Sequence, residues 1–451
     1  MNQTLLLVCF LFIGVLIILS KPENKIFWLF IGYFMVPPGV VIFDRSIYLF
    51  FTLCLLSTLL SKGTREFDYR NIPIKRALIL FIGGTMLIGF FDSRLGLYQK
   101  ISRPMLVLFE SAFTIFIVFF ALRNKINFNN LLDKFYLITF IACIYGLFCR
   151  VTHSNPYIDI ISQSFRLRNI SKDYMTGLDG RFRISSFTFH PYFYGIFLVF
   201  ILFFVIYSVI NEKKIIKKYI LYCLIALILL NIFLTDSRTI LLILVLGISI
   251  LIVVLTNKRN VYKLFIAILF LIIALIQIPF MADKADAIVD IFLSGGTKVE
   301  GSNINLREVQ FILSLGYFYK SPIFGNGLNY IYENMGFAVD VSDRLTDSDL
   351  YAFESHVYIL MIEQGIIGIF IYLLLFISVL LYHIKSYIII KDNSRYFVLV
   401  NMILVFCYFI FIIATGTISS FQLFCFFVAF SLRFQVKARA RYESRSLINR
   451  L

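Results

Sequence analysis

Long apolar runs separated by short polar stretches limit what this chain can fold into. A transmembrane helix needs about 20 predominantly apolar residues, and such runs recur along the whole sequence, as in FLVFILFFVIYSVI at 197–210. The chain is 60% hydrophobic and only 15% charged, whereas soluble domains are about half apolar and about a quarter charged. We therefore expect an all-α polytopic membrane protein.

The apolar runs predict about 12–14 transmembrane helices. Candidate spans lie at 3–20, 26–43, 46–61, 77–91, 104–122, 135–151, 187–210, 219–235, 238–256, 262–281, 356–382, 396–414 and 419–433. The first run has no basic residue before it and no A-x-A-like cleavage site after it, so we interpret it as an uncleaved span rather than a signal peptide.

Basic residues predict the orientation of these spans. Lys and Arg gather in the loops 62–76, 211–218, 256–260 and 383–395 and in the tail 434–451. All of them fall on one side if the spans alternate, and by the positive-inside rule that side is cytoplasmic. This distribution accounts for most of the net charge of +16, so the charge does not indicate nucleic-acid binding. The C-terminus is expected inside, and the N-terminus outside with 13 spans or inside with 12.

Two longer segments, 152–186 and 282–355, then lie on the outer side between three helical regions at 1–151, 187–281 and 356–433. Segment 282–355 has eleven Asp and Glu against five Lys and Arg, which supports an external position. Segment 152–186 instead contains the basic stretch RLRNISKDYMTGLDGRFR at 166–183. An anionic ligand would explain a basic outer loop, although long loops also translocate regardless of their charge.

Several classes of site are not indicated. The sequence lacks P-loop, GxGxxG, HExxH and GxSxG motifs, so neither an ATP-driven motor nor a known hydrolase triad is expected. The seven cysteines lie in apolar runs without CxxC spacing, and the four histidines are not closely spaced. We expect no metal, no cofactor and no disulfide framework.

Charged residues at the outer ends of spans are functional candidates, because ionisable groups at a membrane are costly. Asp236 and Arg238 occupy a short break between two spans. A planar guanidinium suits phosphate oxygens, although a plain tight turn fits the same spacing.

Arg307 stands in the first turn of a predicted amphipathic helix, where a cation opposes the helix dipole. Gly325 and Gly327 predict a sharp turn that brings amides close to a ligand or lets two elements cross closely.

The stretch ESHVYILMIEQGIIG, residues 354–368, places Glu354 and His356 at the start of a span. An imidazole with a near-neutral pKa is a candidate general base. His153 and His190 also fall on the outer side, and His383 falls on the inner side. The alternative for each is an interfacial residue without a role.

Four motifs occur in an order that resembles the O-antigen ligase and O-antigen polymerase superfamily. They are SRTILLILVLG, the Arg307 helix, SPIFGNGLNYI and ESHVYILMIEQGIIGIFIYLLL. GRFRISSFTFHPYFYG at 180–195 is similar to a further family feature, a basic strip that leads into a His-Pro span start. The resemblance covers about residues 180–380 of the chain.

The resemblance implies a bacterial inner-membrane glycosyltransferase that works on the extracytoplasmic face. The donor is a glycan on undecaprenyl diphosphate, and the bond forms with inversion and without a metal. It further implies a chain-length regulator as a partner, besides membrane lipids. In this reading Arg238 and Arg307 stabilise the diphosphate, and His356 or Glu354 is the base. Contacts to substrate come from Arg181, Arg183, His190, Asp236, Gly325 and Gly327.

One departure from the family pattern leaves the base open. Counted back from Glu363, Glu354 occupies the family's His position and Ser355 its Asn position, while His356 is followed by Val357. The base is therefore His356 after a local shift, or Glu354. The departure favours a repeat-unit polymerase for O-antigen or capsule over an O-antigen ligase. A transporter is the rival of another class, but it would place charges near mid-membrane.

Overall fold

The computed structural model describes residues 3–36, 41–42, 45–61, 71–122, 127–165, 182–255, 304–334, 353, 355–415 and 420–448. Its helices are α1 (Gln3–Leu19), α2 (Pro22–Met35), α3 (Ile47–Leu60), α4 (Lys75–Phe91), α5 (Leu97–Phe109), α6 (Ala112–Ala121), α7 (Phe128–Thr152), α8 (Pro156–Phe165), α10 (Pro191–Asn211), α11 (Ile215–Leu234), α12 (Arg238–Leu255), α15 (Ile304–Phe318), α16 (Tyr330–Asn334), α17 (His356–Ile389), α18 (Ser394–Ala414) and α19 (Phe421–Ile448). Two short strands, β1 (Val41–Ile42) and β2 (Arg45–Ser46), pair antiparallel.

Most helices coincide with predicted spans, but span 26–43 is wrong at its end, because α2 stops at Met35 and β1 occupies Val41–Ile42. Span 262–281 lies outside the described residues. Within the described residues, seven helices are long and apolar enough to cross a membrane: α7, α10, α11, α12, α17, α18 and α19. Helices α5 and α6 meet at a 47° bend and together give one broken span, while α1 and α3 are shorter apolar helices. The expected all-α polytopic class is confirmed. The predicted tail at 434–451 starts as a continuation of α19, which runs to Ile448.

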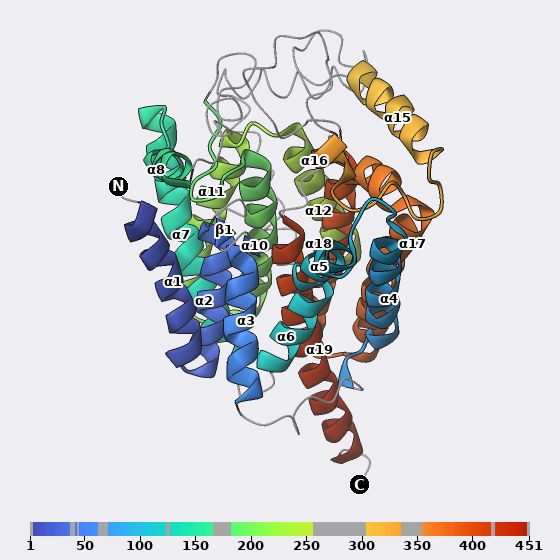
Figure 1. The fold of residues 1–451 in the computed structure, drawn as a ribbon. Coiled ribbons are helices and arrows are strands. Elements are labelled where there is room, and N and C mark those ends of the chain that lie inside the picture. Colours follow the sequence, from blue (N-terminus) through green and yellow to red (C-terminus); the bar gives the residue numbers. More distant parts are fainter. Residues whose placement is uncertain are drawn as a thin grey trace.

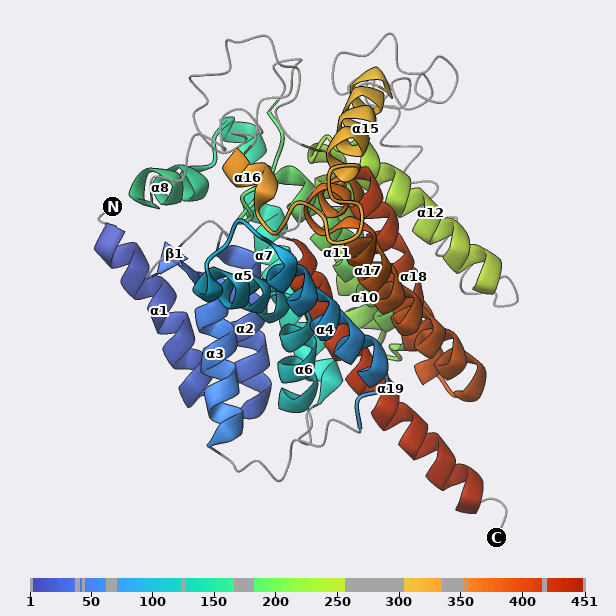
Figure 2. The ribbon, with the colours of Figure 1, turned by 45° about the vertical axis from the view of Figure 1, so that its right-hand side comes forward.

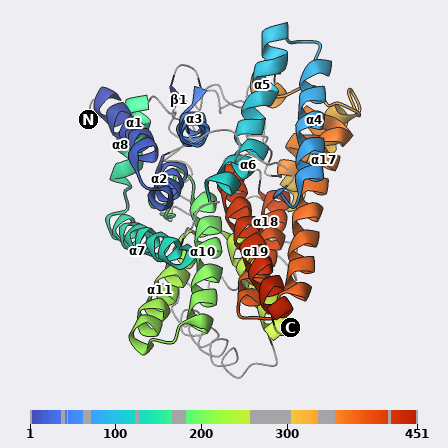
Figure 3. The ribbon, with the colours of Figure 1, turned by 90° about the horizontal axis from the view of Figure 1, so that it is seen from below.

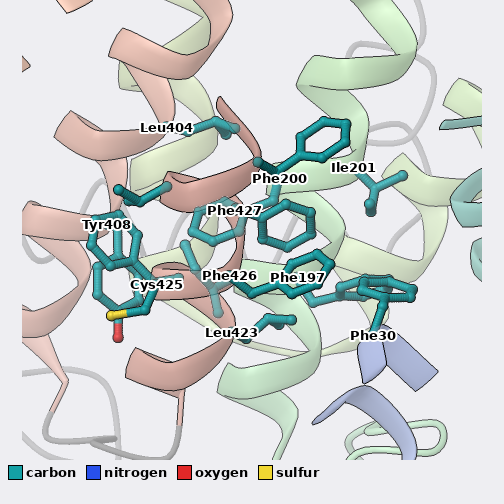
Figure 4. Close-up of a cluster of buried hydrophobic side chains, with 14 of the residues drawn as sticks. Phe30, Phe197, Phe200, Ile201, Leu404, Tyr408, Leu423, Cys425, Phe426 and Phe427 are labelled. Atoms are coloured by element: carbon teal, nitrogen blue, oxygen red, sulfur yellow. The ribbon is translucent and has the colours of Figure 1, made fainter. Parts of the chain in front are cut away.

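Two helices form the centre of the bundle, α10 and α19. Most of their membrane-spanning length is buried, 89% for α10 and 83% for α19, against 39% for α7, α11 and α17 in the surrounding layer. Aromatic side chains from α2, α10, α18 and α19 interlock there (Figure 4), with ring centroids 4.0 Å apart for Phe34 and Phe197 and 4.1 Å apart for Tyr408 and Phe424. Lipid is as apolar as these side chains, so close packing rather than the hydrophobic effect holds them together.

The two ends of the bundle differ. Helices α8, α15 and α16 lie at one end, which we call the outer end, and α19 finishes at the opposite end, which we call the inner end (Figures 1 and 2). Chain direction places the basic residues before α4 and α11, Lys75, Arg76, Lys213 and Lys214, at the inner end. The two chain termini lie toward opposite ends (Figure 1). Within the described residues, seven helices, or eight with the α5–α6 pair, could cross a membrane, so the predicted alternation of 13 spans stays a prediction.

Candidate functional site

Four predicted site residues come together at the outer end. We call them the outer basic corner: Arg183, His190, Asp236 and Arg238. The chain before α10 runs beside the turn between α11 and α12, since the Ile184 amide donates to the Leu234 carbonyl over 3.2 Å. The next turns also pack closely, because a Cβ at Gly195 would lie 2.7 Å from Ile240. The first turns of α10 and α12 are therefore neighbours.

Local chemistry explains the shape of this corner. Asp236 has a φ of 55°, a left-handed conformation that Asp tolerates better than most residues. The Ser237 hydroxyl then accepts a hydrogen bond from the Ile240 amide over 3.3 Å and starts α12. On the neighbouring helix, His190 caps α10 by accepting from the Tyr192 amide at Nδ1 over 3.1 Å, and Pro191 occupies the first helical position.

The cations of this corner can bind an anion. The Arg183 Nε donates to the Thr235 carbonyl over 3.2 Å, and its guanidinium lies 5.0 Å from the Tyr192 ring centre. Its terminal nitrogens make no hydrogen bond within the described part of the chain, and neither does the half-exposed guanidinium of Arg238. Burial, and then the Arg183 charge, lower the pKa of His190 to about 3, so this imidazole stays neutral at physiological pH.

The turn that contains Gly325 and Gly327 is inserted into a break in α17. Gly365 has φ 60° and ψ −156°, which interrupts the helix. The hydrogen bonds expected from 366 to 362 and from 367 to 363 are replaced by bonds to the turn. Asn326 and Gly327 amides donate to the carbonyls of 362 and 363 over 2.8 and 3.0 Å, and the amides of 366 and 367 donate to those of 322 and 323 over 2.9 and 3.2 Å. Hydrogen bonds to the turn thus replace those lost at the break in α17, as burial of backbone within a membrane requires.

This interlock shows what the glycines do structurally. A Cβ at Gly325 would lie 2.3 Å from the Gln364 nitrogen, and one at Gly327 would lie 1.8 Å from the Asp92 carboxylate. Their amides donate to Ser321 and Glu363 carbonyls, so both are already engaged within the protein. Of the two roles considered for this turn, the close crossing of elements is observed. A direct contact of Gly325 or Gly327 with substrate stays a prediction.

An ionic network beside the turn connects the region of α4 and α5 to α16. We call it the outer ionic network: Asp92, Arg94, Arg103 and Glu333. Arg94 donates to both oxygens of Asp92 over 3.0 and 2.7 Å, and its guanidinium lies 3.7 Å from Glu333. Arg103 forms a two-pronged pair with Glu333 and donates to the Leu328 carbonyl over 2.9 Å. These guanidinium groups are already paired, which indicates a structural role.

A double-mutant cycle on Arg103→Gln and Glu333→Gln tests this network. We expect a coupling free energy of about 1 kcal/mol in unfolding experiments in detergent micelles, because the two-pronged pair is partly buried. The matched control is the more exposed pair of Lys217 and Asp133 at the inner end, 2.9 Å apart, for which we expect a smaller coupling. A coupling at Arg103–Glu333 no larger than that of the control would contradict the structural role.

The first two turns of α17 fold back on the rest of the helix. In a straight helix, His356 and Tyr372 would be about 24 Å apart, but their ring centroids are 5.4 Å apart. The break at Gly365 therefore reverses the direction of the chain and places His356 inside the helix bundle. Its side chain is buried, and neither ring nitrogen has a hydrogen-bond partner. Buried polar atoms are rarely left unpaired, so this imidazole is a strong candidate for contact with a substrate.

Further unpaired polar atoms face the same tyrosine. We call this group the interior polar cluster: Glu110, His356, Gln364 and Tyr372. Gln364 Oε1 is buried without a partner, and the Glu110 charge acts on the hydroxyls of Tyr48 and Tyr372. Glu110 occupies the bend between α5 and α6, and its carboxylate makes no hydrogen bond or ion pair within the described residues. Broken helices commonly supply binding groups inside membrane proteins.

For the remaining predicted site residues, the structure gives few contacts or none. Arg307 lies half-buried in the first turns of α15, which packs against α17 through Phe311 and Tyr358, with ring centroids 5.9 Å apart. Glu354 and Arg181 lie outside the described residues. Among the residues that are described, no group of three or more His, Cys, Asp or Glu could hold a metal ion.

A comparison with protein families decides the classification. Residues 223–373 match the O-antigen ligase family. This segment is similar to the O-antigen ligase family over about a third of the chain. The match confirms the resemblance to the polymerase and ligase superfamily, whose members are membrane glycosyltransferases. Among curated proteins, none matches the chain.

The matched segment does not contain the whole candidate site. It includes Arg238, Arg307, the interlocked turn and His356, whereas Arg183, His190 and Glu110 lie before it. Sequence analysis missed Glu110, although a lone carboxylate inside the predicted span 104–122 was the signal that could have found it. It also missed the contacts of Glu363, whose carboxylate accepts from the Ile331 amide over 3.2 Å at the start of α16. The outer ionic network had no local sequence signal.

Proposed function

We propose that the protein is a polymerase that joins undecaprenyl-diphosphate-linked oligosaccharide repeat units into O-antigen or capsule. The reaction takes place on the extracytoplasmic face of the bacterial inner membrane, which corresponds to the outer end of the bundle. The base removes the proton of an acceptor hydroxyl, whose oxygen attacks the anomeric carbon of the donor sugar. The bond to the diphosphate oxygen breaks, with inversion, and undecaprenyl diphosphate leaves.

The observation that carries this proposal is the pair of open guanidinium groups at the outer basic corner. Negative charge develops on diphosphate oxygens as the glycosidic bond breaks. Arg238 is the first residue of α12, and Arg183 precedes α10; the Arg238 guanidinium and the terminal nitrogens of Arg183 make no hydrogen bond within the described residues. Fixed cations near a low-dielectric medium stabilise such charge strongly. Arg307 is the third cation proposed for this role, and His190 and Asp236 contribute substrate contacts.

The base is proposed to be His356, with Glu354 as the alternative. The two unpaired nitrogens of His356 leave one free to accept the proton of an acceptor hydroxyl. Glu110 and Gln364 would orient that hydroxyl, since both act on the hydroxyl of Tyr372, whose ring lies 5.4 Å from that of His356. The ligase alternative uses the same chemistry with lipid A-core as the acceptor, and the family description favours it as the second candidate.

Arg238→Ala tests the diphosphate role. We expect a loss of about 10²–10³ in transfer rate, the usual effect of removing one group that stabilises transition-state charge, with an unchanged protein level in the membrane. The measurement is a surface-glycan gel from a deletion strain that carries wild-type or variant protein. Lys213→Ala, which removes an exposed cation at the inner end, is the control. A normal glycan ladder with Arg238→Ala would contradict the role of this residue.

The deletion strain distinguishes the candidate reactions. Single repeats attached to the acceptor indicate a missing polymerase. Complete loss of attached glycan, with lipid-linked polymer accumulating, indicates a missing ligase. An unchanged ladder would exclude both reactions for that glycan, and a transport function would then become the leading hypothesis.

A further inference from the structure

A polar pocket lies at the inner end of the bundle, the opposite end from the candidate active site. It has a volume of about 580 Å³, within the range of small-molecule binding sites. Its walls come from the starts of α7 and α18 and the ends of α10 and α19; in the view from below, α10 lies between α7 on one side and α18 and α19 on the other (Figure 3). None of the residues proposed for catalysis lines it.

The floor of this inner pocket is aromatic. Phe434 contacts the ring of Phe128 at 5.3 Å and that of Phe397 at 4.0 Å, and Tyr207 contacts Phe397 at 5.1 Å. Phe128, Tyr207 and Phe434 line the cavity itself. A ligand with an apolar part beside its charged group fits such a floor.

The rim of the pocket is cationic. Lys437 and Arg441 line it from α19, four residues apart and so on one face of the helix. The Arg441 Nε donates to the Lys437 carbonyl over 3.4 Å, and Arg441 forms no ion pair within the described residues. The starts of α7 and α18, at Asn129 and Ser394, add the positive ends of two helix dipoles.

Nearby carboxylates accept hydrogen bonds from the first turns of α7 and α18. Asp392 accepts from the Ser394 amide over 2.9 Å, and Glu23 accepts from the Asn127 amide over 3.0 Å and from the Asn130 side chain over 3.1 Å. Neither of these acids lines the cavity. The charged groups that do line it are both cations.

One further polar side chain lines the pocket. Tyr207 is only 9% exposed as a residue, and its hydroxyl makes no hydrogen bond with any described residue. This hydroxyl is not among the fully buried unpaired atoms, so it is accessible from the cavity and can donate to a ligand there.

We propose that the inner pocket binds a phosphate group, supplied by the headgroup of an anionic phospholipid. The Lys437 and Arg441 side chains hold the phosphate oxygens, the Tyr207 hydroxyl donates to the ligand, and the aromatic floor receives the first methylene groups of the acyl chains. The inner end carries the basic loops that predict the cytoplasmic side, where the leaflet is anionic and basic pockets between helices bind lipid headgroups. A free phosphate ester has the same charged group, so the test includes that source.

The test is a series of thermal melts of purified full-length protein in detergent, titrated with phosphatidylglycerol, phosphatidylcholine or inorganic phosphate. We expect phosphatidylglycerol to raise the melting temperature saturably, and phosphatidylcholine to have little effect. The double variant Lys437→Gln/Arg441→Gln should weaken the apparent affinity about 30-fold, since each basic side chain contributes about fivefold. Tyr207→Phe, which removes only the hydroxyl, should weaken it about tenfold.

The matched control is Lys385→Gln/Lys391→Gln, which removes two exposed cations near the inner end of α17 that do not line the pocket. This control should bind phosphatidylglycerol as the wild type does. If inorganic phosphate stabilises the wild type but not the double variant, the result supports the pocket and identifies free phosphate as the source of the phosphate group. Equal stabilisation by phosphatidylcholine, an unchanged affinity in the double variant, or no response to any of the three ligands would overturn the proposal.

Discussion

Gly365→Ala is expected to remove most of the folded protein from the membrane. Gly365 has φ 60° and ψ −156°, a region of backbone space that only glycine populates, where another residue costs about 1–3 kcal/mol. In addition, a Cβ there would lie 2.6 Å from the Gly325 nitrogen and 2.6 Å from the Ile323 carbonyl oxygen. The substitution would force apart the interlock of the turn and α17. The measurement is the amount of monodisperse protein and its melting temperature after extraction in detergent.

Two other glycines provide the controls for this experiment. Gly83 in α4 and Gly316 in α15 have open space where a Cβ would stand, and alanine favours a helix over glycine by about 1 kcal/mol. Gly83→Ala and Gly316→Ala should therefore leave the melting temperature unchanged or raise it. Normal yield and stability for Gly365→Ala would show that the backbone break is not required for folding.

Sequence patterns predicted the helices well because each span carries its own signal. An apolar run of the right length is a local property, so the positions of α7, α10, α11, α12, α17 and α18 followed directly from it. The same signal could not show that α17 is broken and folded back at Gly365. That reversal depends on the turn at 321–328, which supplies the missing hydrogen bonds from 40 residues away.

The candidate site was predicted in part, for a similar reason. Asp236 and Arg238 were selected as charged residues in a break between two spans, and Arg183 and His190 through the family resemblance of their segment. The structure brings all four together. Glu363 was noted only as part of a motif, although it also holds the start of α16. The pairing of Arg103 with Glu333 joins residues 230 positions apart, and a single sequence carries no periodic pattern that predicts such a contact.

His356→Leu is expected to abolish glycan transfer without lowering stability. The imidazole is buried and both nitrogens lack partners, so its removal breaks no hydrogen bond and relieves the cost of burying unpaired polar atoms. If the imidazole is the general base, transfer should fall about 10²–10⁴-fold. The two measurements are the surface-glycan ladder of the complemented deletion strain and the melting temperature of the purified variant.

A second histidine on the same helix provides a matched control. His383 is also fully buried, but its Nδ1 contacts the Val379 carbonyl at 2.7 Å and its Nε2 contacts the Ser431 hydroxyl at 2.8 Å. His383→Leu should therefore lower the stability by about 1–3 kcal/mol and leave the chemical step intact. We therefore expect opposite results from the same substitution at two buried histidines, because the His383 imidazole is hydrogen-bonded within the bundle and the His356 imidazole is not. If His356→Leu keeps a full glycan ladder and Glu354→Gln loses the ladder, the base is Glu354. If both variants keep a full ladder, the proposed location of the active site is contradicted.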